Sequence, residues 1–135
     1  MVILRFILFP FTLIYDFVTR IRNYCYDFGL FKSVHFDIPI IAVGNLSVGG
    51  TGKTPLIEYL IRSLQHKYKI AILSRGYKRK TKGFIFLDHT HTSEDVGDEP
   101  LQFFKKFEKI NVAVDENRVN GIQKLQQKEP MDIIF

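Results

Sequence analysis

The 135-residue sequence contains a single cysteine, Cys25, and has no long uninterrupted apolar run, internal repeat or low-complexity segment. One cysteine cannot form a disulfide within the chain, and there is no zinc-type spacing of ligands. The composition therefore fits a reducing compartment, such as the cytosolic side of a membrane. A chain of this length is sufficient for one domain at most.

Residues 2–15 are strongly apolar, but Arg5 and Pro10 interrupt them and Asp16 follows. A helix that spans a bilayer needs about 20 predominantly apolar residues, so this segment is too short and too broken to cross one. Large aromatic residues, rather than small ones, follow the apolar run, which is not typical of a signal-peptide cleavage site. We predict neither a transmembrane helix nor a cleaved signal peptide.

From residue 11 onward, apolar side chains recur every three or four residues and charged side chains fall largely between them. This spacing predicts an amphipathic helix. It leaves two arrangements open: the helix packs on the rest of the chain, or it lies in a membrane interface with Arg20 and Arg22 near lipid phosphates. The mostly apolar residues 2–9 favour the membrane.

The formal net charge is +5 and the pI is about 9.4. Such a charge favours anionic partners, including nucleotides, phosphorylated lipids and nucleic acid, without choosing among them. His89 and His91 alternate in a predicted loop, but they lack thiolates or another clear ligand nearby, so we assign no metal to them.

After residue 32, short apolar segments alternate with segments of helical spacing. Strands are predicted at residues 38–45, 69–74, 83–88, 110–115 and 131–135, and helices at residues 54–65, 101–107 and 117–127. This rhythm is typical of an α/β fold with a mostly parallel sheet covered by helices. Residues 1–32 then form an N-terminal amphipathic, membrane-associating helix, and residues 33–135 form the α/β domain. Because the last predicted strand has no polar tail after it, we expect this domain to be incomplete.

A glycine-rich loop, "GNLSVGGTGKTP" at residues 44–55, joins the first predicted strand to the first predicted helix. Its end matches the phosphate-loop pattern GxxxxGK[ST], whereas Ser47 stands where most such loops have glycine. Backbone amides of such a turn, and the helix that follows it, bind phosphate oxygens. Lys53 would reach the β and γ phosphates, and the Thr54 hydroxyl would ligate Mg²⁺. The predicted nucleotide-binding residues are Ser47, Val48, Gly49, Gly50, Thr51, Gly52, Lys53 and Thr54.

Val48 argues against the nearest alternative. Partitioning and site-selection ATPases have a related loop, KGGxGKT, in which the early lysine reaches the nucleotide of a dimer partner. In this sequence Val48 stands at the position of that lysine. A membrane-associated ATPase switch of that type is therefore ranked second among our hypotheses. A non-catalytic, basic membrane-binding module is the third.

The loop and four further segments resemble the tetraacyldisaccharide 4'-kinases of lipid A synthesis. The segments are "RNYCYDFGLFKS" at residues 22–33, "ILSRGYKRK" at 72–80, "VGDEP" at 96–100 and "VAVDENRVNGI" at 112–122. The resemblance implies a P-loop kinase that uses ATP and Mg²⁺ to phosphorylate the 4'-hydroxyl of the lipid A disaccharide precursor. It also implies an amphipathic anchor at the cytoplasmic face of a Gram-negative inner membrane, with no nucleic-acid partner. The sequence carries no signal for the oligomeric state.

The resemblance also implies roles for individual residues. Lys53 and Asp98 would be catalytic, with Asp98 as the base, and Glu99 would support the metal or the base. Arg75 and Arg118 would contact a phosphate or sugar of the substrate.

The residues alone leave other interpretations open for three of these positions. Asp98 could cap the helix that follows it. Arg75 could belong to a solvated basic turn, since Lys78, Arg79, Lys80 and Lys82 continue the positive charge. Arg118 could pair with Asp115, the predicted cap of its helix.

Members of this kinase family continue beyond the position of residue 135, with an acidic motif resembling DDxFQHR and a later histidine. Because these groups would complete the magnesium site and the base, we expect the chain to be an N-terminal fragment with little activity by itself.

Overall fold

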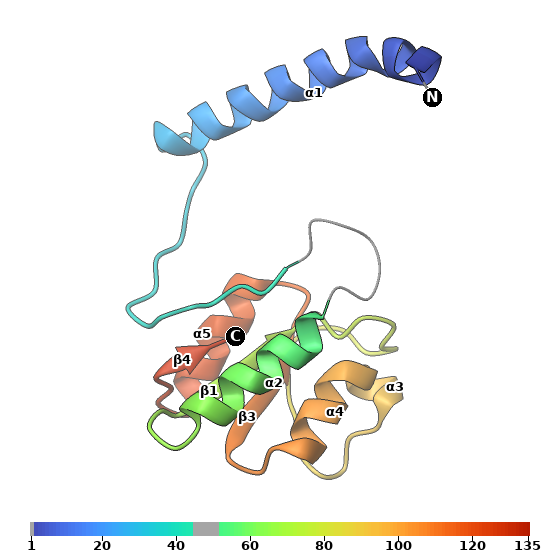
Figure 1. The fold of residues 1–135 in the computed structure, drawn as a ribbon. Coiled ribbons are helices and arrows are strands. Elements are labelled where there is room, and N and C mark those ends of the chain that lie inside the picture. Colours follow the sequence, from blue (N-terminus) through green and yellow to red (C-terminus); the bar gives the residue numbers. More distant parts are fainter. Residues whose placement is uncertain (1, 45–51) are drawn as a thin grey trace. The chain divides into compact units, whose positions relative to one another are not determined.

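The computed structural model describes residues 2–44 and 52–135. The chain divides into two compact units, Met1–His35 and Phe36–Phe135, and each is described here by itself (Figure 1).

The first unit is built on one long helix, α1 (Val2–Asp27), which continues through Pro10. The helix begins at Val2, nine residues before residue 11, where the sequence first shows regular helical spacing of apolar residues. Local side-chain pairs support its second half, because the Asp16 carboxylate accepts a hydrogen bond from Arg20 at 2.8 Å and the rings of Tyr24 and Phe28 lie 4.1 Å apart. Among the helices of the described residues, none is both long and apolar enough to cross a membrane.

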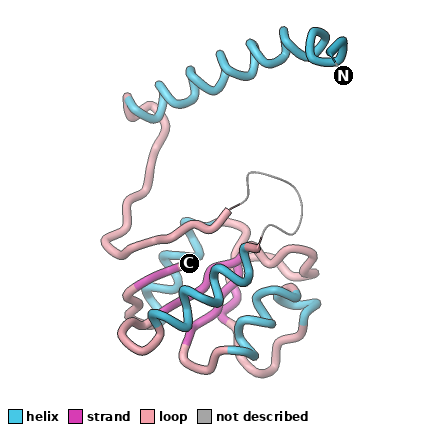
Figure 2. Tube along the Cα trace, in the orientation of Figure 1, coloured by secondary structure: helices cyan, strands magenta, loops and turns pink. Residues whose placement is uncertain are grey.

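The second unit contains a sheet of four strands, shown in magenta in Figure 2. They are β1 (Ile70–Ser74), β2 (Ile85–Phe86), β3 (Ile110–Val114) and β4 (Ile133–Ile134), in the order β2-β3-β1-β4. β1 pairs in parallel with both β3 and β4, and β2 pairs antiparallel with β3. The predicted mostly parallel α/β sheet is confirmed.

The strand predicted at residues 38–45 is wrong in extent within the described part of this segment. Ile40 forms only an isolated parallel bridge with Ile134, in which Ile134 N–H donates to the Pro39 carbonyl at 3.1 Å. Pro39 has no N–H to donate and β4 is only two residues long, so the ladder cannot extend. The side chains of Ile40 and Ile41 are exposed, which places this segment at the sheet edge instead of in the predicted buried position.

Helices cover both faces of the sheet (Figure 1). They are α2 (Lys53–Leu64), α3 (Ser93–Val96), α4 (Asp98–Lys106) and α5 (Arg118–Lys128). Side chains of a strand alternate between its faces, so Ile70 and Ile72 join a core cluster with residues of α2 and α4, while Ala71 and Leu73 join one with α5. This double burial explains why β1 reads as a continuous apolar run.

The close approach of α5 to β1 requires glycine at position 121. A Cβ atom there would lie 2.8 Å from Leu73 Cδ1 and 3.0 Å from Asp115 Cβ. The helix can therefore bring its first turn against the end of β1 only with no side chain at this position.

The chain leaves the neighbouring strands β1 and β3 toward opposite faces. After β1 it passes through the edge strand β2 into α3 and α4, whose Val96 and Phe103 belong to one core cluster. After β3 it leads into α5, whose Leu125 belongs to the other cluster. Such a divergence leaves a crevice at the carboxyl ends of the two strands, where open α/β sheets bind ligands. The fold therefore places a site after Ser74 and Val114.

Candidate functional site

A pocket of about 510 Å³ lies at this crevice. Four charged residues from four parts of the chain line it: Lys53 from α2, Arg75 after β1, Glu99 from α4 and Arg118 from α5. The remaining lining residues are Ala42, Val43, Gly44, Ile57, Ile72, Leu73, Ser74, Phe103 and Phe135. The structure therefore brings together Lys53, Arg75, Glu99 and Arg118, which are four of the residues predicted from the sequence.

Two helices begin at this pocket and are linked to each other along their length. At their first turns, the Thr54 hydroxyl donates a hydrogen bond to the Glu99 carboxylate at 2.8 Å. Further along, Lys106 Nζ pairs with the Glu58 carboxylate at 2.6 Å. The amino-terminal ends of α2 and α4 thus lie together, and their unpaired backbone N–H groups and helix dipoles favour an anion there.

Arg75 and Arg118 bring two further positive charges to the pocket. Arg118 Nη1 donates to the carbonyl of Leu73 at 3.3 Å, which holds its guanidinium at the end of β1. Partial burial, and then the charge of Arg75, lower the pKa of Arg118. An anion bound between the two guanidinium groups would relieve this repulsion.

The interpretation of Asp98 as a helix cap is wrong. The N-cap of α4 is Gly97, which has φ +94° and forms no side-chain cap bond, and Asp98 is the first helical residue. Its exposed carboxylate lies in the first turn, where a negative charge is favourable. Asp98 is not among the residues that line the pocket, although its neighbour Glu99 is.

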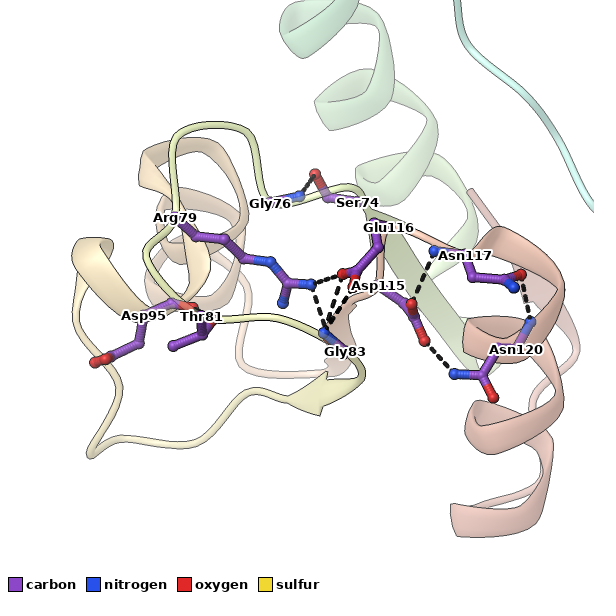
Figure 3. Close-up of polar contacts among 10 residues, drawn as sticks. All are labelled: Ser74, Gly76, Arg79, Thr81, Gly83, Asp95, Asp115, Glu116, Asn117 and Asn120. Carbon is purple, nitrogen blue, oxygen red and sulfur yellow. Dashed lines mark hydrogen bonds and ion pairs between the residues drawn. The ribbon is translucent and has the colours of Figure 1, made fainter.

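The prediction that Asp115 caps the helix of Arg118 is also wrong. Asn117 is the N-cap of α5 and accepts a hydrogen bond from the Asn120 backbone N–H. Asp115 is instead buried beneath the turn, where its carboxylate accepts from the Asn117 N–H at 2.8 Å and from Asn120 Nδ2 at 2.5 Å (Figure 3). Arg118 therefore has no ion pair with Asp115, because that carboxylate holds the turn.

The basic run after Arg75 is not a uniformly solvated turn. The side chain of Arg79 is only 4% exposed and pairs with Glu116, and Lys80 pairs with Glu94 at 2.7 Å on the surface. Thr81 also donates to the Asp95 carbonyl at 2.5 Å. Sequence reasoning missed the Arg79–Glu116 pair because 37 positions separate its members and neither position has a local pattern that marks burial.

The predicted loop residues Ser47, Val48, Gly49, Gly50 and Thr51 lie outside the described residues. Within residues 2–44 and 52–135, no three side chains of His, Cys, Asp or Glu gather as a metal site. Gly52 precedes α2 with φ +78°, a conformation that suits glycine at the end of such a loop.

Comparison with known proteins identifies the family. Residues 4–135 match the family described as "Tetraacyldisaccharide-1-P 4'-kinase". The chain belongs to this 4'-kinase family. The predicted family is therefore confirmed, and the family assignment favours the first of the three hypotheses over the ATPase switch and the basic membrane module.

Individual members of the 4'-kinase family are similar over most of this chain. A tetraacyldisaccharide 4'-kinase of Flavobacterium johnsoniae is 57% identical over 98% of the chain and 40% of its own length. That of Flavobacterium psychrophilum is 63% identical over 90% of the chain and 36% of its own length. A crystal structure of LpxK from Aquifex aeolicus in complex with ATP is 37% identical, with a TM-score of 0.79, and the match covers 97% of this chain and 42% of that one. The chain thus spans about 40% of the length of the relatives it matches.

Proposed function

We propose that this chain forms the ATP-binding part of a kinase that phosphorylates the 4'-hydroxyl of the tetraacyldisaccharide 1-phosphate precursor of lipid A. The observation that carries this proposal is the pocket in which Lys53, Arg75, Glu99 and Arg118 converge at two helix amino-termini. A site with three cations beside helix dipoles suits a polyphosphate. The names of the relatives, and the ATP in the Aquifex aeolicus structure, support the nucleotide and the acceptor.

In the proposed reaction, the 4'-oxygen of the lipid attacks the γ-phosphorus of ATP, the bond to the β,γ-bridging oxygen breaks, and ADP leaves. The hydroxyl proton passes to the carboxylate of Asp98, which is exposed and one residue from Glu99 of the pocket. Lys53 binds the transferred phosphoryl group, and Arg75 and Arg118 bind phosphate or sugar oxygens.

Thr54 and Glu99 are the described residues that fit Mg²⁺. Their side-chain oxygens lie 2.8 Å apart, Glu99 lines the pocket, and a hydroxyl and a carboxylate are ligands that this ion prefers. When bound, Mg²⁺ would neutralise charge on the phosphates.

Nucleotide binding by the chain itself tests the first half of this proposal. We expect isothermal titration to show ATP binding that depends on Mg²⁺, and we expect Lys53→Ala to weaken it at least 10-fold because the phosphates lose their point charge. Lys67→Ala, which changes an exposed lysine beyond α2, is the matched control and should bind like the unchanged chain. Equal affinity of all three proteins would contradict the proposed site.

A chimera tests phosphoryl transfer. The chain replaces the aligned 40% of the Flavobacterium johnsoniae relative, and ATP-dependent phosphorylation of the tetraacyldisaccharide 1-phosphate is measured. Asp98→Asn should reduce kcat more than 100-fold with little change in the KM for ATP, because it removes the base and leaves the phosphate site. A chimera that binds ATP but leaves the lipid unmodified would overturn the proposed acceptor.

We further propose that α1 lies in the membrane interface at the cytoplasmic face of the inner membrane, beside its lipid substrate. Its apolar spacing, with Arg20 and Arg22 between the apolar positions, suits anionic lipid surfaces. Sedimentation with vesicles containing phosphatidylglycerol should show binding that is lost in the double variant Phe17→Ser, Ile21→Ser. The surface variant Asp27→Ser is the control, and retention of binding by the double variant would count against this role.

A further inference from the structure

The buried guanidinium of Arg79 joins two segments of the site that are far apart in sequence. Arg79 Nη2 donates to the Gly83 carbonyl at 2.7 Å and also pairs with the Glu116 carboxylate (Figure 3). The same carboxylate accepts the Gly83 backbone N–H, at 2.9 Å through Oε1 and 3.0 Å through Oε2. Arg79, Gly83 and Glu116 thus form a closed link, named here the Arg79 clamp, between the segment after β1 and the segment after β3.

Each segment of the clamp carries one arginine of the pocket. Arg75 lies between Ser74 and Gly76, and Gly76 has φ +67° and rests against the Arg79 side chain. A Cβ atom on Gly76 would lie 2.9 Å from Arg79 Nε, so the guanidinium fills the space beneath this turn. On the other segment, Arg118 follows Glu116 by two residues, at the start of α5.

The clamp is a poor device for stability alone. Within the described residues Arg79 Nη1 is buried without a hydrogen-bond partner. The Arg79 side chain is only 4% exposed, whereas that of Glu116 is 55% exposed, so the pair costs mainly the desolvation of the guanidinium, and the unpaired N–H adds to that cost. An apolar side chain in the same space would avoid both costs. A planar guanidinium does what an apolar side chain cannot, because it fixes two backbone segments at one distance and angle.

We propose that Arg79 is a positioning residue that sets the spacing of Arg75 and Arg118, and thereby the affinity of the pocket for a phosphate ester or pyrophosphate. The proposal rests on the function proposed above. Two guanidinium groups bind one anion cooperatively only if the distance between them matches the size of the anion. Arg75 and Arg118 each belong to one of the two segments that the clamp joins.

Binding of inorganic pyrophosphate to the 135-residue chain tests this role without phosphoryl transfer. A double-mutant cycle of Arg75→Ala and Arg118→Ala should show at least 5-fold coupling, because either arginine alone loses the bridged anion. Arg79→Lys keeps the positive charge but not the planar fork. We expect it to weaken pyrophosphate binding about 10-fold and reduce the coupling below 2-fold, at a temperature where circular dichroism shows a folded chain. Lys80→Ala, from an exposed ion pair of the same segment, is the matched control and should leave both values unchanged.

Glu116→Gln provides a second variant, because it loosens the same clamp from the exposed side and should also reduce the coupling if Arg79→Lys does not fold. The proposal is overturned if pyrophosphate binding does not depend on Arg75 and Arg118, or if the coupling persists in every folded clamp variant. These outcomes differ from failure of the proposed function. If the chimera does not phosphorylate the lipid but the clamp variants reduce the coupling, the proposed function fails and the role of Arg79 holds. If the chimera is active but the coupling is unchanged in the clamp variants, the kinase function holds and the role of Arg79 fails.

Discussion

The segments that follow β1 and β3 reach the same edge of the sheet and each supplies an arginine to the pocket, but they are held in different ways. The segment after β3 is fixed by its own neighbours, since Asp115 accepts hydrogen bonds from Asn117 and Asn120. The segment after β1 is fixed by remote residues, since Arg79 pairs with Glu116 and Thr81 donates to the Asp95 carbonyl.

This difference separates a self-supporting half of the site from a half that depends on its surroundings. Closing a local turn orders few residues, so the segment after β3 keeps its shape whenever α5 forms. The segment after β1 depends on contacts with residues outside it, among them the Glu116 side of the Arg79 clamp. Changes to the two segments should therefore differ in size and in their dependence on pH.

The largest effect is expected from Asp115→Ala. The change leaves the Asn117 N–H and the Asn120 side chain without their buried acceptor, and each lost partner costs about 1–3 kcal/mol. We expect the free energy of unfolding to fall by about 2–4 kcal/mol, measured by urea denaturation.

The matched control is Asp115→Asn, which keeps one side-chain acceptor at the same place and should lose less stability than the alanine variant. A loss below about 1 kcal/mol for Asp115→Ala would mean that the turn after β3 does not depend on this carboxylate, and the proposed contrast with the segment after β1 would fail.

A smaller, pH-dependent effect is expected from Glu116→Gln. The Gly83 N–H, then the N–H of Glu116 itself and the charge and hydrogen bond of Arg79, lower the pKa of Glu116 from its ordinary value of 4.5. A carboxylate with a lowered pKa in the folded state stabilises the protein above its unfolded pKa, and this contribution is lost as the pH falls through the folded value. The unchanged chain should therefore lose its advantage in Tm over Glu116→Gln below about pH 4.5. An advantage that stays constant down to pH 3 would show that the clamp does not depend on the ionised carboxylate.

The sequence predicted the sheet and its helices well where burial is strong. Both faces of β1 and β3 are covered, and a strand buried on both faces has a short continuous run of apolar residues. That run predicts each of the two strands from the sequence. The strand at residues 38–45 was overestimated because the same apolar letters, "IPIIAV", also occur at an edge, where Pro39 and a two-residue neighbour limit pairing. Apolarity alone does not distinguish a central strand from an edge.

At the site, four residues predicted from the sequence line one pocket, namely Lys53, Glu99 and the two pocket arginines. They come together because each lies just after a strand or in the first turn of a helix at the crevice. Two cap interpretations are wrong, namely the alternative left open for Asp98 and the predicted cap Asp115, because Gly97 and Asn117 hold those positions. The cap of a helix depends on where its first turn begins, which is the least certain boundary in a sequence. Periodicity also could not show that, within the run of positive residues after β1, the Arg79 side chain is the buried one.

The smallest effect is expected from Lys80→Ala, which removes the other ion pair of the segment after β1. Lys80 and Glu94 have side chains 72% and 66% exposed, and water screens both charges, so their pair should contribute less than about 0.5 kcal/mol. The backbone N–H of Lys80 donates to the Glu94 carbonyl at 2.7 Å, and this contact does not require the lysine side chain. Urea denaturation in low and high salt measures the difference. A large salt-dependent loss would mean that the segment is held by its surface charges instead of by the buried arginine one residue earlier.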